Sequence, residues 1–356
     1  MKQLLEIPAY RQELSEIAPE FASFTELDGK HFLITGAGGL IGRYLTDLLM
    51  TLKEKYFPAL AVTVLARNRE KTEAIFAPYL ADPGFKVLIR DVTLLTAEDT
   101  VESYDYLIHA ASNAHPLAYA KDPVGTFLAN ITGTERMVGL TLRNAHARFL
   151  FLSSSEVYGP ADNDVDHPLY EDDYASPDIR DPRSCYSESK RAAETYCACC
   201  RVQYGLDYVA VRPGHVYGPT ATDSNSRADI QFFRKAVAGE EIVMKSEGKQ
   251  CRSYCYIGDA ARGLLYALLK GESGAAYNIS NRHSYVTIRG LAEKIAEKGG
   301  TTLRFELPDQ TEKAGFSRIQ MSILAPDKLE ALGFAPIFSL DKGVERTARL
   351  MKAMQE

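Results

Sequence analysis

Tyr186 and Lys190 are the two residues whose types and spacing point most directly to catalysis. They stand four positions apart in a helical pattern, so their side chains share one face of that helix. A lysine ammonium beside a phenol favours the phenolate and is expected to lower the pKa of the tyrosine from its usual value of about 10. We therefore predict that the pair removes a proton from a substrate alcohol near neutral pH.

A polar run, Ser153-Ser154-Ser155-Glu156, stands upstream of this pair, directly after the apolar residues 148–152. Its hydroxyls can hold a substrate alcohol, and the glutamate carboxylate can move a proton. Two plainer alternatives stay open. The serines also fit the polar end of a strand, and the glutamate also fits a structural residue that hydrogen-bonds the nearby backbone.

A glycine-rich turn, residues 35–42, follows the apolar run 31–34 and precedes a helical pattern over 43–52. Backbone N–H groups of such a turn close on a diphosphate, and the N-terminus of the helix adds its positive end. The pattern predicts a dinucleotide site, although the G-x-x-G-x-x-G spacing also fits a plain connection. The residues expected to contact the cofactor here are Gly36, Gly38, Gly39, Leu40, Ile41 and Gly42.

The strands that must position these residues are predicted from short apolar runs separated by helical patterns. After 31–34, the runs are 61–65, 86–89, 106–109, 148–152 and 208–211, and the clearest helices span 123–144 and 187–204. This alternation predicts an α/β fold, a Rossmann-type doubly wound parallel sheet covered on both faces, with ligands at the carboxyl ends of the strands. Further cofactor candidates in these loops and helices are Arg67, Asp91, Val92, Ala110, Ala111, Ser112, Asn130 and Pro213.

The same patterns divide the chain into three parts. Residues 1–28 are expected to form a helical N-terminal extension, and residues 29–212 the dinucleotide-binding domain. Residues 213–356 are expected to form mainly a smaller substrate-binding lobe, with a helix at about 230–238. The segment from about 258 to 283 is expected to return to the first domain.

Composition excludes several classes of function. The chain has 356 residues, 25% charged residues and a net charge of −6, which disfavours a nucleic-acid-binding protein. It has no run of about 18 apolar residues and no apolar signal-peptide core, so we expect a cytoplasmic protein with no membrane span. Its six cysteines include no C-x-x-C pair, so we expect free thiols and no metal.

Taken together, these motifs resemble the extended short-chain dehydrogenase/reductase family, also called the NAD-dependent epimerase/dehydratases. The resemblance runs from about residue 30 to 342 in the family's order and spacing. It is carried by the glycine turn, the Ser153–Gly159 run, Tyr186-x-x-x-Lys190, Val216-Tyr217-Gly218-Pro219, Arg252-Ser253-Tyr254 with Asp259, and Leu332-Gly333-Phe334. The resemblance implies a bound nicotinamide cofactor and a nucleotide-linked sugar as substrate.

Within that family, residues 171–195 and 155–159 look most like UDP-glucuronate decarboxylases. The chain also resembles epimerase/dehydratase homologues with N-terminal extensions, found in polysaccharide biosynthesis. The implied reaction begins when Tyr186 takes the proton of a sugar hydroxyl at C4, which Ser154 holds, while a hydride moves to the nicotinamide. The transient 4-ketone then loses CO₂ from a uronic acid, or takes hydride back on its other face as in a C4 epimerase.

A third outcome of the ketone is elimination of water, as in the 4,6-dehydratases. Those enzymes carry an Asp-Glu pair at this loop, where our chain has Ser155 and Glu156. Dehydration needs an acid for the leaving hydroxyl, and a serine is a poor general acid at pH 7. The sequence therefore favours decarboxylation or epimerisation over dehydration.

Three residues are candidates for holding the substrate. Arg252 matches the family's diphosphate-binding arginine, and Arg227 matches an arginine in the decarboxylase pattern. An arginine fork suits two phosphate oxygens, although either residue also fits a solvated surface charge. His215 replaces the usual Asn of an N-x-Y-G-P motif, where it can donate one hydrogen bond or simply pack in the loop.

The sequence gives opposing indications about whether the cofactor is NAD or NADP. Arg67 stands after the second predicted strand, where NAD-binding members commonly have Asp, and it could pair with the 2′-phosphate of NADP. The decarboxylase resemblance favours NAD, which we expect, with Asp91 accepting the adenine amine. An NADPH-dependent nucleotide-4-ketosugar reductase is an alternative enzyme, and a non-catalytic dinucleotide sensor is a more distant alternative.

The resemblance also implies a homodimer. Family members pair through the helices that here span 123–144 and 187–204, which would form a four-helix interface. The apolar face that fits this arrangement consists of Val124, Phe127, Leu128 and Ile131, which could equally pack on the sheet.

Overall fold

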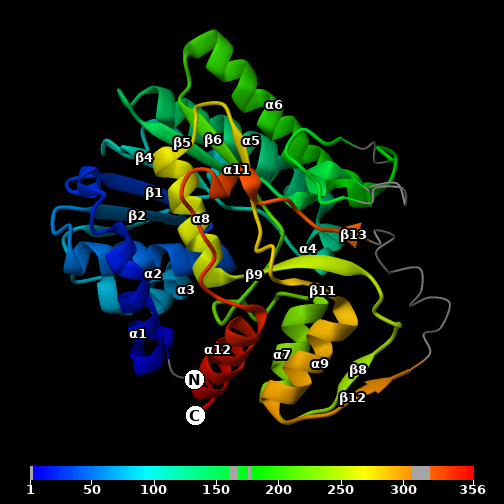
Figure 1. Cartoon of the computed structure of the whole chain (residues 1–356). Coiled ribbons are helices and arrows are strands. Elements are labelled where there is room, and N and C mark those ends of the chain that lie inside the picture. Colours follow the sequence, from blue (N-terminus) through cyan, green and yellow to red (C-terminus); the bar gives the residue numbers. More distant parts are fainter. Residues whose placement is uncertain (1–2, 160–166, 175–177, 307–320) are drawn as a thin grey trace.

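A seven-stranded, all-parallel sheet forms the centre of the computed structural model, which describes residues 3–159, 167–174, 178–306 and 321–356. The spatial order is β10-β6-β5-β4-β1-β2-β3, so the chain reverses direction across the sheet between β1 and β4 (Figure 1). Its strands are β1 (His31–Thr35), β2 (Ala61–Ala66), β3 (Phe85–Ile89), β4 (Tyr106–His109), β5 (Arg148–Leu152), β6 (Tyr208–Pro213) and β10 (Ala276–Ile279). The six predicted strands and the doubly wound Rossmann-type fold are confirmed.

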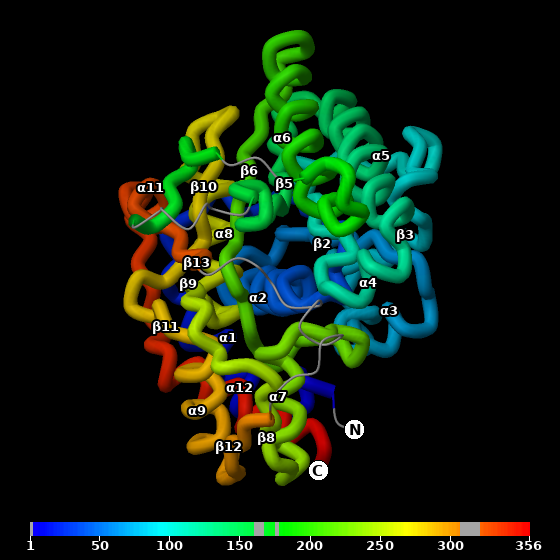
Figure 2. Tube along the Cα trace, turned by 90° about the vertical axis from the view of Figure 1, so that its right-hand side faces the viewer, coloured from blue at the N-terminus to red at the C-terminus, as the bar shows by residue number. Residues whose placement is uncertain are grey.

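Helices cover both faces of the sheet because successive strand residues point to opposite sides. Phe32 and Ile34 of β1 belong to a core shared with α2 (Leu40–Lys55) and α8 (Ile257–Lys270). Leu33, between them, belongs to a second core with α5 (Pro123–Leu142) and α6 (Cys185–Tyr204). Figure 2 shows α2 and α8 on the side of the sheet away from α5.

The predicted helices are present with shifted ends. The helix expected over 187–204 begins two residues earlier, so that Tyr186 lies in its first turn. Gly205, with φ +73°, ends it in a left-handed conformation. The remaining helices of this half are α3 (Arg69–Ile75) and α4 (Pro116–Lys121), with short 3₁₀ turns η4 (Ala77–Tyr79), η5 (Val92–Leu94), η6 (Ser155–Tyr158) and η7 (Pro182–Ser184).

The predicted apolar face of α5 does not pack on the sheet. Val124, Phe127 and Leu128 are 68%, 40% and 47% exposed, respectively. Ile131, on the same face, is half-buried. The alternative that these residues pack in the core is therefore wrong for Val124, Phe127 and Leu128 in the single chain, whereas Ile131 packs against the second core.

A second group of elements lies beyond the carboxyl ends of the central strands (Figures 1 and 2). Its small sheets consist of β7 (His215–Tyr217), β9 (Cys251–Tyr256), β11 (Tyr285–Thr287) and β13 (Met321–Ser322), and of β8 (Ile242–Met244) with β12 (Leu303–Phe305). Its helices are α7 (Ala228–Val237), α9 (Ile288–Gly299) and α12 (Leu340–Ala353), whereas the short α11 (Asp327–Glu330) packs against α8 and β10 of the central sheet. After β9, the chain runs back through α8 to β10, which pairs with β6 in the central sheet.

The residues before β1 form a chain of short helices. These are η1 (Leu4–Glu6), α1 (Pro8–Ile17), η2 (Ala18–Phe21) and η3 (Thr25–Leu27). Leu4, Tyr10, Leu14 and Phe21 are fully buried in the core that contains α2 and α8. Figure 1 shows α1 beside α2, with both chain ends near α12. Within the described residues, no helix is long and apolar enough to cross a membrane.

Candidate active site

A cleft of about 380 Å³ lies between the carboxyl ends of the central strands and the second group of elements. This is where ligands bind in open parallel sheets. The predicted site residues that line it are Gly36, Gly39, Leu40, Ile41, Gly42, Ala110, Ser112, Ser154, Ser155, Glu156, Tyr186, Lys190, Pro213, His215, Arg227 and Arg252. The predicted residues outside its lining are Gly38, Arg67, Asp91, Val92, Ala111 and Asn130.

The turn between β1 and α2 can be built only from glycines at two positions. Gly36 has φ +67°, and a Cβ there would lie 2.5 Å from the carbonyl oxygen of Ala110. A Cβ on Gly42 would lie 2.4 Å from the carbonyl oxygen of Gly36. At the start of α2, Gly39 provides no side-chain cap, so the first N–H groups of the helix remain available to an anion in the cleft. These features fit the diphosphate of a dinucleotide.

Arg67 and Asp91, after β2 and β3, form a pair with 3.8 Å between Nη1 and Oδ2. The arginine side chain is 75% exposed. Burial alone would raise the pKa of Asp91, but hydrogen bonds from the Thr93 amide and hydroxyl, together with the Arg67 charge, lower it. Asp91 therefore stays ionised beside Arg67 and offsets part of its positive charge.

Asn130 lies behind the cleft, fully buried on α5. Its Nδ2 donates a hydrogen bond of 2.9 Å to the Ser189 hydroxyl and so joins α5 to α6. Among the described residues its Oδ1 has no hydrogen-bond partner. Val92 is also buried, and the Ala111 amide donates to the Thr35 hydroxyl at 3.1 Å. These three residues support the cleft wall from behind.

Tyr186 and Lys190 lie together on α6, as their spacing predicts. The lysine is 2% exposed, and its Nζ donates a 2.6 Å hydrogen bond to the carbonyl of Leu152 at the end of β5. The same Nζ lies 4.7 Å from the centre of the Phe151 ring and 5.9 Å from that of Tyr186. The ammonium is therefore held against the end of the sheet, below the tyrosine.

The predicted lowering of the tyrosine pKa is wrong for the protein alone. Burial raises the pKa of Tyr186 to about 12, and the Glu156 charge adds to this, whereas a hydrogen bond from Ser154 and the Arg227 charge oppose it. Burial also lowers the pKa of Lys190 to about 7, against the opposing charge of Glu194. The spacing argument failed because it ignored burial of the phenol, which disfavours the charged phenolate.

The three serines differ in role: Ser153 is structural, whereas the hydroxyls of Ser154 and Ser155 are accessible from the cleft. The Ser153 hydroxyl donates to Glu194, which in turn pairs with Arg212 at 2.6 Å, so this serine is a polar strand end. The Ser154 hydroxyl accepts the amide of Glu156 at 3.1 Å and caps η6. Ser154 and Ser155 both line the cleft, where a substrate alcohol can reach their hydroxyls.

Glu156 faces the cleft rather than the backbone. Its side chain is exposed, and no side-chain hydrogen bond to backbone is found for it within the described part of the chain. The surrounding protein nevertheless raises the pKa of the carboxyl, against the opposing charges of Arg183 and Arg252. The position of Glu156 in the cleft lining disfavours the structural alternative.

Two arginines and a histidine of the second group of elements line the side of the cleft opposite Glu156. Arg252 of β9 is 4% exposed and donates to the carbonyl of its neighbour Cys251 at 2.8 Å. Arg227 reaches the carbonyl of Val216 and pairs with Asp229 at 2.9 Å, while its buried Nε has no partner among the described residues.

His215 of β7 completes that wall. Burial and the charges of Arg252 and Arg227 lower its pKa well below the usual value, so the ring is neutral. Its edge meets the Tyr254 ring, with 5.6 Å between ring centres, and its Nδ1 has no partner within the described residues. A neutral imidazole can donate one hydrogen bond, so His215 is compatible with the predicted substrate contact.

Among the lining residues that were not sequence candidates, Tyr119 and Arg183 lie closest to the proposed chemistry. Tyr119 of α4 stacks on Tyr186, with 5.6 Å between ring centres and planes 22° apart. Arg183 lies three residues before Tyr186 and lowers the pKa of Glu156 through its charge. Arg183 belongs to the decarboxylase-like segment 171–195, of which residues 175–177 lie outside the described structure. Nothing in the sequence singled out Tyr119.

Metal chemistry finds no support in the described side chains. No group of three or more His, Cys, Asp or Glu residues within them could hold a metal ion. The six cysteines are free thiols.

Comparisons with known proteins agree with this geometry. The model of the NAD dependent epimerase/dehydratase family matches residues 32–280. UDP-glucuronic acid decarboxylase 1 of Xenopus tropicalis is 30% identical over 341 residues, covering 92% of this chain and 74% of that protein. UDP-glucuronic acid decarboxylase 3 of Arabidopsis thaliana is 31% identical, covering 88% and 86%.

Solved structures share the fold at lower identity. A UDP-glucose 4-epimerase from Thermotoga maritima, in complex with UDP-glucose, has a TM-score of 0.75 and 22% identity, covering 92% of this chain and all of that one. A dTDP-glucose 4,6-dehydratase from Streptomyces venezuelae with NAD bound has a TM-score of 0.75 and 24% identity, covering 90% and 96%.

Proposed function

The chain is an enzyme of the NAD-dependent epimerase/dehydratase family, and we propose that it decarboxylates UDP-glucuronate through a transient 4-ketone. One observation carries this proposal. Tyr186, Ser154 and Glu156 line one side of a cleft whose other side presents Arg227 and Arg252, in a chain about 30% identical to decarboxylases over most of its length. A C4 epimerase is the second candidate, since it would use the same first step.

NAD is the cofactor that we assign. When bound, it accepts a hydride from the sugar carbon and later returns it. The glycine turn and the uncapped start of α2 would hold the diphosphate, with Ala110, Ser112 and Pro213 around it. The Arg67–Asp91 pair supports NAD over NADP, because Asp91 offsets part of the Arg67 charge that a 2′-phosphate would need.

Tyr186 is the group that we assign to proton transfer at the C4 hydroxyl. Ser154 would hold the same hydroxyl, and its hydrogen bond to the phenol together with the Arg227 charge opposes part of the rise in the tyrosine pKa that burial causes. Lys190 fixes the start of α6 against β5 through the Leu152 carbonyl. The phenol therefore stays in place while its proton is exchanged.

Decarboxylation follows from the position of the substrate carboxylate. Once C4 is a ketone, the carboxylate on C5 is β to it, so the electrons left by CO₂ spread onto the ketone oxygen as an enolate. We assign Glu156, which lines the cleft, to the return of a proton to C5. Ser155 at the position of the dehydratase aspartate supports this outcome over loss of water.

The diphosphate of the substrate would be held by Arg252 and Arg227, with His215 as a single hydrogen-bond donor. Arginine suits this task because its fork can bind two phosphate oxygens at once. The neutral state of His215 removes any extra cation from this wall.

A product survey tests the proposal. The protein is incubated with UDP-, dTDP-, CDP- and GDP-sugars, including UDP-glucuronate, and the products are identified by mass spectrometry. We expect a UDP-pentose from UDP-glucuronate with no net consumption of cofactor. Conversion of a neutral UDP-sugar to its C4 epimer, with the uronate untouched, would establish the epimerase instead, and stoichiometric loss of NADPH would establish a reductase.

We also propose a homodimer through α5 and α6. The exposed face Val124, Phe127 and Leu128 supports it, because covering these side chains would remove apolar surface from water. Phe127→Glu should convert a dimer to a monomer in analytical ultracentrifugation, and a wild-type monomer would refute the interface. Where in the cell the enzyme works stays a prediction.

A further inference from the structure

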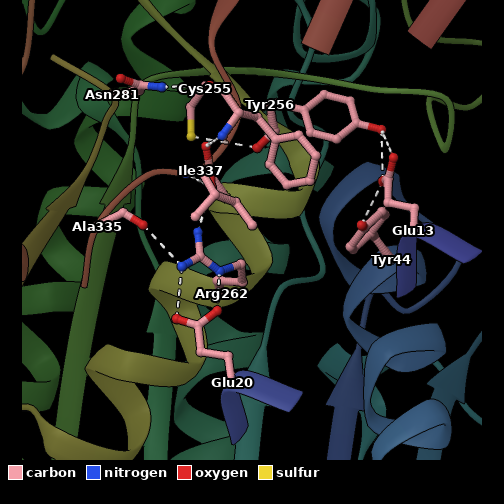
Figure 3. Close-up of polar contacts among 11 residues, drawn as sticks. Glu13, Glu20, Tyr44, Cys255, Tyr256, Arg262, Asn281, Ala335 and Ile337 are labelled. Atoms are coloured by element: carbon pink, nitrogen blue, oxygen red, sulfur yellow. Dashed lines mark hydrogen bonds and ion pairs between the residues drawn. The ribbon is translucent and has the colours of Figure 1, made fainter. Parts of the chain in front are cut away.

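Glu13, on α1 of the N-terminal segment, is a carboxylate buried to 1% exposure with every contact satisfied. Its Oε1 accepts the hydroxyl of Tyr44 at 2.7 Å and that of Tyr256 at 2.8 Å. Its Oε2 accepts Tyr256 at 3.0 Å and pairs with Arg346 of α12 at 2.8 Å. Figure 3 shows both tyrosine hydroxyls converging on this one side chain.

The two tyrosines lie behind the cleft, on the two elements that form its opposite walls. Gly42 is the last cleft-lining residue of α2, and Tyr44 follows two positions later. Tyr254 is the last cleft-lining residue of β9, and Tyr256 follows two positions later on the same strand face. Glu13 thus joins the helix that starts at the glycine turn to the strand that carries Arg252.

A second carboxylate anchors the same segment. Glu20 of η2 pairs with Arg262 of α8, which also bonds Asp259 at 2.6 Å (Figure 3). Asp259 in turn accepts the amides of Ile337 and Phe338 at 2.9 and 3.1 Å. Carboxylates of the N-terminal segment therefore tie it to the C-terminal part of the chain, and Glu13 is the one that contacts both α2 and β9.

We propose that Glu13 is a positioning residue, which fixes the distance between the glycine turn and Arg252 and so aligns the bound cofactor with the bound sugar. The inference rests on the proposed function, since it assigns the two ligands to these two walls. A buried polar network with all partners satisfied holds one arrangement, and a change of about 1 Å in the reacting geometry can cost about a hundredfold in rate.

The cofactor and the nucleotide sugar are bound by different residues on the two walls. Loss of the link is therefore expected to affect catalysis rather than binding. Loosening the link should leave the affinity for each ligand within about threefold but lower kcat by at least about tenfold, because only the alignment of the two is lost. A residue that merely stabilised the fold would lower the melting temperature and leave kcat unchanged in the protein that remains folded.

Glu13→Gln tests the link, and Glu16→Gln is its matched control. Glu16 lies one turn along the same helix, is largely exposed and pairs with the same Arg346 at 3.1 Å, but touches neither tyrosine. Tyr44→Phe and Tyr256→Phe each remove one donor while keeping the buried pair with Arg346, so they serve if Glu13→Gln fails to fold. We expect kcat to fall in all three link variants and not in Glu16→Gln.

Hydrogen exchange of the same proteins gives a readout that needs no turnover. In Glu13→Gln, amides of β9 and of the first half of α2 should exchange faster than in Glu16→Gln, even if UDP-glucuronate is not the substrate. If Glu13→Gln exchanges faster but the wild type does not convert UDP-glucuronate, the proposed reaction is refuted. The structural link through Glu13 is then still supported. Equal exchange, or an equal kcat in an active enzyme, would overturn the positioning role.

Discussion

The ammonium of Lys190 lies 2.6 Å from the carbonyl oxygen of Leu152 and 5.9 Å from the ring centre of Tyr186. This lysine is held by the sheet, and burial lowers its pKa to about 7. Between about pH 7 and 10.5 the folded chain therefore holds fewer protons than the unfolded chain. Unfolding takes up a proton in this window, so the Lys190 contribution to stability grows as the pH rises.

Lys190→Met should remove that dependence. The rise in unfolding free energy between pH 7 and 9 should be smaller than in wild type, by at most about 1.4 kcal/mol per pH unit. Urea unfolding of both proteins at the two pH values measures the difference. Identical pH slopes would show that this ammonium is not perturbed by burial.

Tyr186→Phe should keep cofactor binding and lose turnover. The phenyl ring can still stack on Tyr119, but no group remains to exchange the proton of the sugar hydroxyl. We expect kcat to fall by at least about a hundredfold. Titration with NAD provides the binding control, and full activity on the true substrate would remove Tyr186 from proton transfer.

Arg252→Ala should raise KM more than it lowers kcat, because a diphosphate contact acts in both ground state and transition state. Arg289, largely exposed and paired with Glu293 at 2.7 Å, offers a control arginine on the adjacent helix α9. Arg289→Ala should leave both constants unchanged. An unaltered KM in Arg252→Ala would place the phosphates elsewhere.

Gly36→Ala should weaken both stability and NAD binding. Its Cβ would meet the Ala110 carbonyl at 2.5 Å, in a backbone conformation that favours glycine. At Gly139 of α5 an added Cβ meets nothing within 4 Å, so Gly139→Ala should hold or raise the melting temperature. Thermal unfolding with and without NAD separates the two effects, and equal behaviour of both variants would contradict the crowded turn.

Local patterns in the sequence were enough to predict the sheet and most of the cleft wall. Apolar runs marked the strands, and the loops after them carry Gly36 and Ser154 to the cleft. Tyr119 escaped prediction because only the packing of α4 against α6 brings it to Tyr186. The role of Glu13 was equally hidden, since its partners lie 31, 243 and 333 residues away in the chain.

Burial explains the one chemical prediction that failed. The four-residue spacing correctly placed Lys190 beside Tyr186, but spacing says nothing about solvent. Burial of the phenol itself, with the Glu156 charge beside it, raises the pKa of Tyr186 instead of lowering it. Sequence likewise gave no sign that Asp91 pairs with Arg67.

UDP-glucuronate deuterated at C4 provides the most direct test of the central claim, a redox-neutral decarboxylation through a ketone at that carbon. The account predicts CO₂ release and a UDP-pentose that keeps its deuterium at C4, because the hydride leaves and returns within one active site. Release of CO₂ with loss of the deuterium, or recovery of the uronate unchanged, would contradict it.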